Sequence, residues 1–192
     1  SYLQANGFFT VTEYPILEVL ADDSARTVTD VDVIGIRFPG AGDSSNVTST
    51  VGVTAEPDPI LDIHDDQIEV VIGEVKEGAA VLNKSARDPE VLGAVLRRLG
   101  RIDPVLSERL IEDLIAAGEA LHPAGIRIRL MVFASKPPNR KNYRYTWVSH
   151  GRIANWLTKQ VSDNWDAVKT IQSKDPALGF LLLFEKARRG EG

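Results

Sequence analysis

The sequence contains no cysteine, which excludes disulfide bonds and thiolate zinc sites. Any metal that this chain binds must therefore be held by oxygen atoms or by imidazole nitrogen. A chain without cysteine is compatible with a reducing compartment, and we expect a cytoplasmic protein.

The sequence also lacks a long hydrophobic run. The longest run near the C-terminus extends from Leu178 to Phe184, far shorter than the roughly 20 apolar residues that cross a bilayer. The N-terminal letters SYLQANG contain neither the basic region nor the apolar stretch of a signal peptide, and they are typical of a helix end. We expect a soluble protein without a membrane partner.

Positive charge is scarce in the first part of the chain. Residues 1–80 hold 3 Lys or Arg against 15 Asp or Glu, whereas residues 81–192 hold 19 against 12. The net charge of −5 argues weakly against a nucleic-acid partner, because phosphate binding depends on Lys and Arg. The stretch from Ala120 to Ser162 contains basic residues but no acidic residue, so a polyanion could dock on it.

The length of 192 residues and the hydrophobic content of 43% predict one domain, residues 1–192, with a continuous core. Residues 39–66 are dominated by Gly, Ser, Thr, Asp and Pro, and predict a polar loop insertion. Segments rich in β-branched and aromatic residues predict strands, the first two joined as a hairpin, over residues 8–20, 28–38, 67–76, 126–134 and 143–149.

Two Asp-Pro pairs are typical of helix starts, Asp88 before Pro89 and Asp103 before Pro104. The second of these helices is predicted to continue until a stop around residues 123–125. The last two strands are expected to be joined by the basic turn SKPPNRKN, and further helices are predicted over residues 153–161, 163–172 and 176–188. This order predicts an α/β domain in which helices flank a mixed central sheet.

Charged residues at strand spacing form the most informative pattern. Side chains two apart on a strand share a face, so Glu74 and Lys76 in GEVKEG project together, as do Asp30 and Asp32 in TDVDVIGIR. If these strands pair, Asp32 lies near Glu74 and Lys76, and two hard oxygen ligands stand beside a cation. Mg²⁺ suits such a site. Phosphodiester cleavage needs this combination, because the phosphate charge must be neutralised and a water must be oriented for attack.

These two strands resemble the PD-(D/E)xK, or restriction-endonuclease-like, nuclease superfamily. DVDVIGIR resembles its acid-bearing strand and IGEVKEG its ExK strand, within a match that covers roughly residues 5–100. The resemblance implies a restriction-endonuclease-like fold and hydrolysis of DNA with Mg²⁺ or Mn²⁺. It assigns metal binding to Asp32, Glu74 and the backbone carbonyl of Val75, and orientation or activation of the water to Lys76. The sequence departs from the family pattern in two ways. The insertion between Asp32 and the ExK strand is long, and the acidic residue that the family carries on its first helix is not visible in or before SYLQANG.

Several other residues are weaker candidates. Glu13 is a candidate for an additional acid, although an acid beside Tyr14 is more often an edge or turn residue. Asp58 follows a proline as in the family pattern, but the next residue is also proline and denies it regular strand pairing, so Asp32 ranks above it. His64 and its acidic neighbours are interpreted as a solvated loop. The candidates for nucleic-acid contacts are Lys136, Arg140, Lys141 and Arg144.

Alternatives remain open at this point. Glu74 and Lys76 could form an exposed ion pair without a function, worth at most about 1 kcal/mol. The chain could also be a catalytically inactive nuclease-fold module that binds nucleic acid or protein, or a nuclease that acts on RNA or junctions. We expect a homodimer, because such nucleases often cut both strands as dimers.

Overall fold

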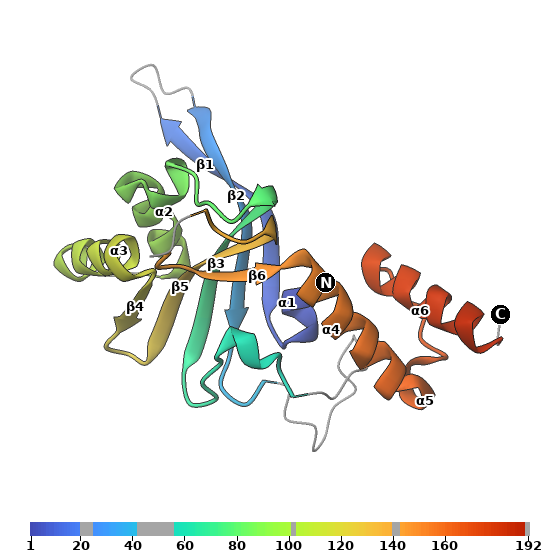
Figure 1. The fold of residues 1–192 in the computed structure, drawn as a ribbon. Helices are drawn as coiled ribbons and strands as arrows, with labels where there is room; N and C mark the ends of the chain where they lie inside the picture. Colours follow the sequence, from blue (N-terminus) through green and yellow to red (C-terminus); the bar gives the residue numbers. More distant parts are fainter. Residues whose placement is uncertain (20–24, 42–55, 101–102, 140–142, 191–192) are drawn as a thin grey trace.

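The computed structural model describes residues 1–19, 25–41, 56–100, 103–139 and 143–190. It is an α/β protein with a six-stranded mixed sheet in the order β1-β2-β3-β5-β4, and β6 also pairs with β5 (Figure 1). The predicted α/β class with a mixed sheet flanked by helices is confirmed. None of the helices in the described ranges is long and apolar enough to cross a membrane.

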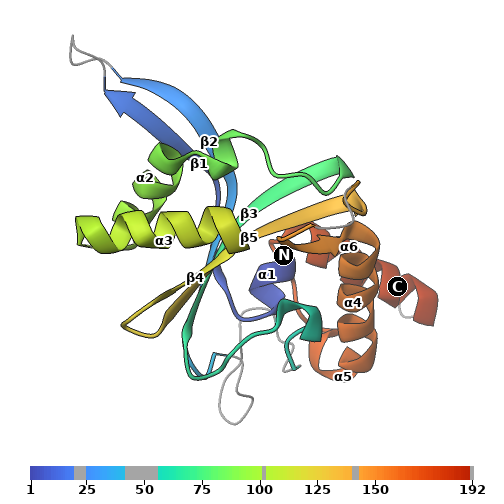
Figure 2. The same cartoon turned by 60° about the vertical axis from the view of Figure 1, so that its left-hand side comes forward.

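The predicted hairpin is confirmed, since β1 (Phe9–Val19) and β2 (Ala25–Arg37) pair antiparallel. The far end of this hairpin projects beyond the rest of the sheet (Figure 2). The central strand β3 (Ile68–Ala79) pairs antiparallel with β2 and parallel with β5 (Ile126–Lys136). Because β3 and β5 are parallel, the chain between them must cross one face of the sheet.

Two helices make that crossing, α2 (Pro89–Leu99) and α3 (Pro104–Ala117). Both begin as predicted, because Asp88 and Asp103 accept hydrogen bonds from backbone N–H groups in the first turn of their helix. Before α2, the short 3₁₀ helix η2 (Ser85–Arg87) turns the chain away from the end of β3.

The predicted end of α3 is wrong. The helix stops at Gly118, which adopts φ 84° and donates a 2.9 Å hydrogen bond to the Leu114 carbonyl. Glycine tolerates this left-handed cap without a steric penalty. The following residues form the strand β4 (Glu119–His122), which pairs antiparallel with β5 and directs Ala120 into the core.

The last strand also differs from the prediction. β6 (Thr146–Ser149) is shorter than expected and runs parallel to β5, so a simple turn does not join the two strands. The connection instead passes the end of α3, where Arg144 Nη1 donates to the Ala116 carbonyl at 3.0 Å and the Tyr145 hydroxyl to the Ile115 carbonyl at 3.1 Å. β4 and β6 therefore occupy successive parts of the same edge of β5.

Helices cover both faces of the sheet (Figures 1 and 2). Alternate residues of β3 separate two cores: Ile72 packs in the core under α2 and α3, whereas Val71 packs in the core on the side of α1 (Tyr2–Ala5) and α4 (His150–Asp163). A third cluster around Trp165 and Leu182 joins α4 to α5 (Trp165–Val168) and α6 (Pro176–Arg189).

The described part of the predicted insertion contains one short 3₁₀ helix, η1 (Pro59–Leu61). Asp58 caps it by accepting a 3.2 Å hydrogen bond from the Ile60 N–H, and Leu61 is fully buried in the core on the α1 side. Residues 42–55 of the insertion lie outside the described residues.

Candidate functional site

Asp32 lies where β2 and β3 stop pairing. The register of these strands ends at Val33 opposite Gly73, and its continuation places Asp32 opposite Glu74. At this point Asp32 Oδ2 accepts a 2.7 Å hydrogen bond from the backbone N–H of Val75. The Asp32 carboxylate thus accepts a hydrogen bond from the β3 backbone at a point where β2 and β3 no longer pair. This hydrogen bond holds the Asp32 side chain against β3.

Glu74 is buried on the same face of β3 as Lys76, as the strand spacing predicts. Its side chain is 10% exposed, and Oε1 forms an ion pair with the Lys76 ammonium group, which is itself 28% exposed. The same Oε1 accepts a 2.5 Å hydrogen bond from Asn83 Nδ2. The structure therefore brings together the three predicted residues Asp32, Glu74 and Lys76, with Asn83 as a fourth member. We call these four residues the Glu74 site.

Each carboxylate of the Glu74 site has one oxygen without a partner among the described residues. Within the described chain, neither Asp32 Oδ1 nor Glu74 Oε2 takes part in a hydrogen bond or ion pair. Carboxylate oxygens are ligands that Mg²⁺ and Mn²⁺ prefer, and Mg²⁺ usually keeps several waters beside one or two carboxylates. The described residues contain no group of three His, Cys, Asp or Glu side chains that could hold a metal. Two carboxylate oxygens are compatible with an ion that completes its shell with water.

The environment of Glu74 favours its neutral form. Burial raises the pKa of the Glu74 carboxyl above its ordinary value, Lys76 lowers it by hydrogen bonding and charge, and the charge of Asp32 raises it again. A cation beside both carboxylates would offset this cost, because it would neutralise their mutual repulsion.

A small pocket with a volume of about 20 Å³ lies beside Glu74 and is partly open to solvent. Its floor is apolar, with Ile72 and Leu130 from the sheet and Leu92 from α2. Polar groups lie along its rim, among them the exposed Asp30 and Ser85 of η2. The Glu74 site is therefore bounded by an apolar surface on the α2 side.

Tyr143 contributes a buried hydroxyl near this site. Its ring packs against the core under α2 and α3, but its hydroxyl has no hydrogen-bond partner in the described chain. Burial raises the pKa of Tyr143 to about 12, the charge of Glu74 adds to the rise, and Arg87 opposes it. The hydroxyl thus lies within the electrostatic influence of both Glu74 and Arg87.

Sequence reasoning missed Asn83 and the hydroxyl of Tyr143. Asn83 belongs to the loop after β3, where neither strand nor helix periodicity applies. Its only sequence signal is its position soon after the ExK strand. Nothing in the spacing of Tyr143 indicated where its hydroxyl would lie.

Glu13 stands across the β1–β2 ladder from Asp32, because the pairs Thr12–Val33 and Tyr14–Val31 flank it. It is exposed and adopts φ 53°, a left-handed conformation that costs a residue with a side chain on the order of 1 kcal/mol. It does not join Asp32 and Glu74 in a three-ligand group within the described residues. Its role as an additional acid stays a prediction.

Asp58 lies in a different cluster, on the α1 and α4 side. It is 1% exposed, accepts a 2.8 Å hydrogen bond from the Tyr2 hydroxyl and pairs with Arg152 at 2.5 Å. Its backbone N–H donates to Asn6 Oδ1 at 2.6 Å. Burial alone would raise the pKa of Asp58, but the hydrogen bonds from Arg152 and Tyr2 outweigh it and hold the pKa below its usual value. These contacts tie the insertion to the two helices.

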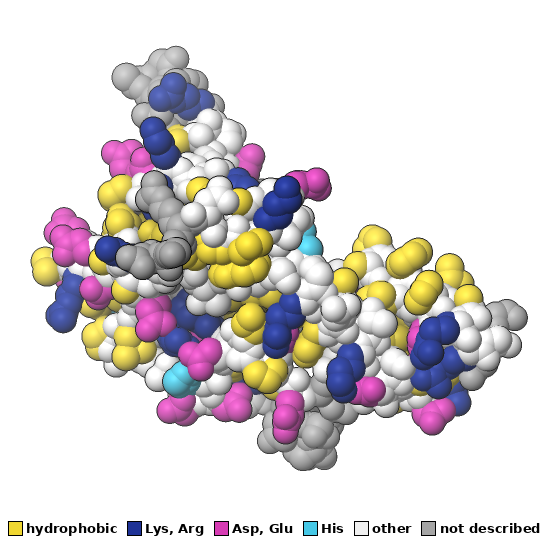
Figure 3. All heavy atoms as spheres, viewed as in Figure 1, with side chains coloured by type: hydrophobic (Ala, Val, Ile, Leu, Met, Phe, Trp, Pro, Cys, Tyr) yellow, Lys and Arg dark blue, Asp and Glu magenta, His cyan; other side chains and the backbone are white. Residues whose placement is uncertain are grey.

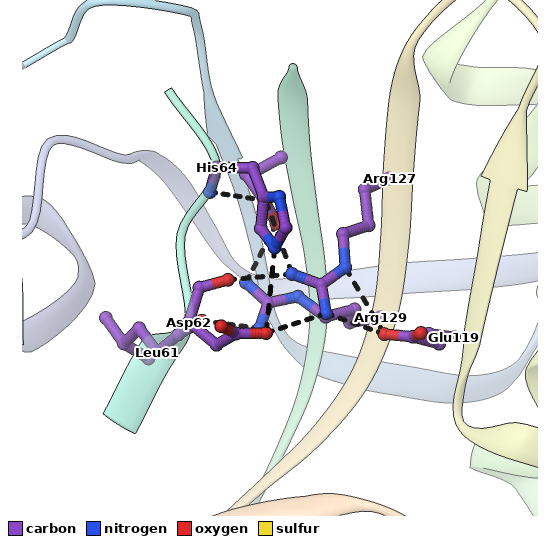
Figure 4. Close-up of polar contacts among 7 residues, drawn as sticks. Leu61, Asp62, His64, Glu119, Arg127 and Arg129 are labelled. Carbon is purple, nitrogen blue, oxygen red and sulfur yellow. Dashed lines mark hydrogen bonds and ion pairs between the residues drawn. The ribbon is translucent and has the colours of Figure 1, made fainter. Parts of the chain in front are cut away.

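A second charged cluster lies at the beginning of β3 (Figure 4). Glu69 is fully buried, and its Oε2 pairs with Arg129 at 2.8 Å while its Oε1 accepts the His64 N–H at 3.1 Å. Arg127 reaches Asp62 and Glu119 at 3.1 and 2.8 Å. We call Asp62, Glu69, Glu119, Arg127 and Arg129 the Glu69 cluster. His64 and Asp62 thus belong to an ion network rather than to a merely solvated loop.

Of the four basic candidates for nucleic-acid contacts, the structure describes Lys136 and Arg144. Arg140 and Lys141 lie outside the described residues. Lys136 is exposed at the end of β5, and Arg144 is bonded to the end of α3. In the acid-free stretch of the sequence, three arginines pair with acids from elsewhere in the chain: Arg127, Arg129 and Arg152.

Comparisons with protein-family models, curated proteins and solved structures find no match for this chain. The class defined by the fold is an α/β protein with a six-stranded mixed sheet. The narrower nuclease interpretation depends on the residues of the Glu74 site.

Proposed function

We propose that this chain is a metal-dependent nuclease that hydrolyses DNA phosphodiester bonds with Mg²⁺ or Mn²⁺, on a restriction-endonuclease-like domain. The observation that carries the proposal is the pair of unengaged oxygens, Asp32 Oδ1 and Glu74 Oε2, beside the ammonium group of Lys76. Hard oxygen ligands next to a cation are the groups that phosphodiester hydrolysis requires.

Each residue of the Glu74 site has a role in this proposal. Asp32 and Glu74 hold the metal ion, with the Val75 carbonyl as a further ligand. When bound, Mg²⁺ or Mn²⁺ would neutralise charge on the phosphate and make a bound water more acidic. Lys76 orients the attacking water, whose oxygen forms a bond to phosphorus as the bond to the leaving sugar oxygen breaks. Asn83 and Lys76 fix the position of Glu74 by occupying Oε1.

A second candidate function is a catalytically inactive module that binds nucleic acid or protein. The observation that favours it is that protein donors already satisfy one oxygen of each carboxylate, the Val75 N–H at Asp32 and Asn83 with Lys76 at Glu74. Such contacts can hold the site together without a metal.

The test measures metal binding and cleavage on the same samples. Mn²⁺ is titrated calorimetrically into the wild type and into Asp32→Ala and Glu74→Ala. On the same samples, plasmid nicking and cleavage of a single-stranded RNA are assayed separately. We expect both variants to lose Mn²⁺ binding and nicking. Lys76→Ala should lose nicking while it retains Mn²⁺ binding. The exposed Asp66, changed to alanine, is the matched acidic control and should behave as wild type.

Three outcomes separate the candidates. A wild type that binds no Mn²⁺ and nicks no DNA rejects the nuclease and favours the inactive module. Loss of activity in Asp66→Ala but not in Asp32→Ala contradicts the site assignment. Cleavage of RNA alone keeps the site and changes the substrate, because the same carboxylates would then act on a strand that carries 2′-hydroxyl groups.

A further inference from the structure

Six arginines of the described chain pair with acids of the same chain. Their charge is therefore already compensated and is less available to an anion from outside. These arginines are Arg37, Arg127, Arg129, Arg152, Arg188 and Arg189. Cations that form no such pair are the ones to examine as contacts for a polyanion.

Three exposed cations without an ion pair in the described ranges border the Glu74 site: Lys84, Arg87 and Lys136. Lys84 follows Asn83 directly and precedes η2, and Arg87 is the last residue of η2. Lys136 is the last residue of β5. We call these three residues the cationic rim. Lys and Arg side chains are visible around the ends of β3 and β5 in the space-filling view (Figure 3).

Contacts within the chain hold the rim beside Glu74. The hydrogen bond from Asn83 to Glu74 fixes the loop that carries Lys84, and Ser85 of η2 lines the same pocket as Glu74. On the other side, the Ala80 N–H donates a 3.0 Å hydrogen bond to the Lys136 carbonyl, which keeps the end of β5 next to the segment that leaves β3. The rim therefore comes from two segments that meet at the carboxyl ends of β3 and β5.

We infer that the cationic rim is a docking surface for the phosphates that flank the scissile phosphate of a nucleic-acid strand. This inference rests on the proposed function and adds to it the place where the substrate backbone lies. The two segments of the rim lie beside Glu74, so a phosphate strand on the rim would pass next to the carboxylates whose free oxygens suit a cation. An acidic protein would bring scattered carboxylates, whereas a nucleic acid presents a regular row of charges that the separated cations can contact.

The experiment compares two triple variants with equal loss of charge. The first is Lys84→Gln, Arg87→Gln and Lys136→Gln. The matched control is Arg97→Gln, Arg98→Gln and Arg109→Gln. It removes three exposed cations, from the last turn of α2 and from α3, that form no ion pair with another described residue. Binding to a labelled DNA duplex is followed by fluorescence anisotropy at several salt concentrations, with Ca²⁺ in place of Mg²⁺. Circular dichroism melts verify that both variants are folded.

We expect the rim variant to bind DNA at least about tenfold more weakly. Its plot of log affinity against log salt should lose close to one unit of slope for each phosphate contact removed. The control variant should stay within about twofold of wild type, because only the overall charge has changed. Equal losses in both variants, or no loss in the rim variant, overturn the inference.

Two further measurements keep this inference distinct from the proposed function. Glu74→Gln should bind DNA in the same assay and fail to cleave it. If Glu74→Gln still cleaves, the proposed function fails even when the rim variant has lost binding. If polyglutamate binds the wild type through the rim and DNA does not, the partner is an acidic protein and the inference is wrong.

Discussion

Glu69 and Glu74 are two buried glutamates of one strand with opposite surroundings. Glu69 is 0% exposed and Glu74 is 8% exposed. Both oxygens of Glu69 have partners, because Arg129 pairs with Oε2 while the His64 N–H binds Oε1. At Glu74, Oε1 has two partners and Oε2 has none in the described chain. A buried carboxylate that is fully engaged holds the fold together, whereas one with a free oxygen is available to a ligand.

The difference follows from where each glutamate lies in the sheet. Beside Glu69, the parallel strand β5 supplies arginines on the same face, and the segment around η1 closes over them with the Leu61 carbonyl, which accepts from Arg129 Nη1 at 2.5 Å. Beside Glu74, β2 has left the ladder, and the neighbour of Glu74 on β5 is the apolar Val132. Within the described chain, the two ends of β3 thus differ in how fully their buried glutamates are paired.

The largest effect is expected when Glu69 is changed to glutamine. The change leaves Arg129, which is 2% exposed, buried without its charge partner, and such losses cost about 3–5 kcal/mol of unfolding free energy. Urea denaturation of Glu69→Gln and Glu74→Gln measures both ends of the strand. Glu74→Gln should stay within about 1 kcal/mol of wild type, because Lys76 can turn to water. Equal costs at both positions would contradict the comparison.

The next effect is a pH dependence that belongs to Glu74 alone. Its folded pKa is raised above the ordinary 4.5, so the folded protein holds a proton that the unfolded chain has already lost. Stability linked to Glu74 therefore falls as the pH rises through the raised pKa, and Glu74→Gln should abolish this fall. Mn²⁺ requires the ionised carboxylate, so its affinity should rise over the same interval. Calorimetric titrations of Mn²⁺ from acidic to neutral pH will measure this affinity. A Mn²⁺ affinity that is unchanged across this range would count against Glu74 as a ligand.

Removal of the Asn83 side chain should have a smaller effect. Asn83→Ala takes away one donor from Glu74 Oε1, and a single hydrogen bond to a charged group is worth about 1.5–3 kcal/mol. We expect cleavage to fall by about tenfold or more, and the acidic limb of the pH–rate profile to move to higher pH, because the ionised carboxylate has lost a donor. A fall in rate without this movement would mean that Asn83 only supports the loop.

The smallest effect is expected at the edge of the Glu69 cluster. Glu119 is 53% exposed and shares Arg127 with Asp62, so Glu119→Gln leaves the guanidinium group with a partner. Exposed ion pairs contribute about 0–1 kcal/mol, and thermal unfolding should detect little change. A loss of more than about 2 kcal/mol would show that the cluster acts as one unit up to its surface.

The site could be predicted from the sequence only in part. Strand periodicity placed Glu74 with Lys76, and the antiparallel pairing of two neighbouring strands brought Asp32 to them. The charge count of the basic stretch did not indicate that Arg129 and Arg152 pair with Glu69 and Asp58, acids that are far away in the sequence. Residue counts cannot reveal such pairs, which form only when distant segments pack together.

The sequence by itself determined the local features of this protein. Asp88 and Asp103 start their helices because a carboxylate followed by proline caps a helix whatever surrounds it. Only the tertiary structure decided the end of α3 at Gly118, the parallel direction of β6 and the role of Asn83. It also left one oxygen of Glu74 without a partner among the described residues. These features depend on which segments meet across the sheet, and the free energy of those contacts is absent from any local pattern of residues.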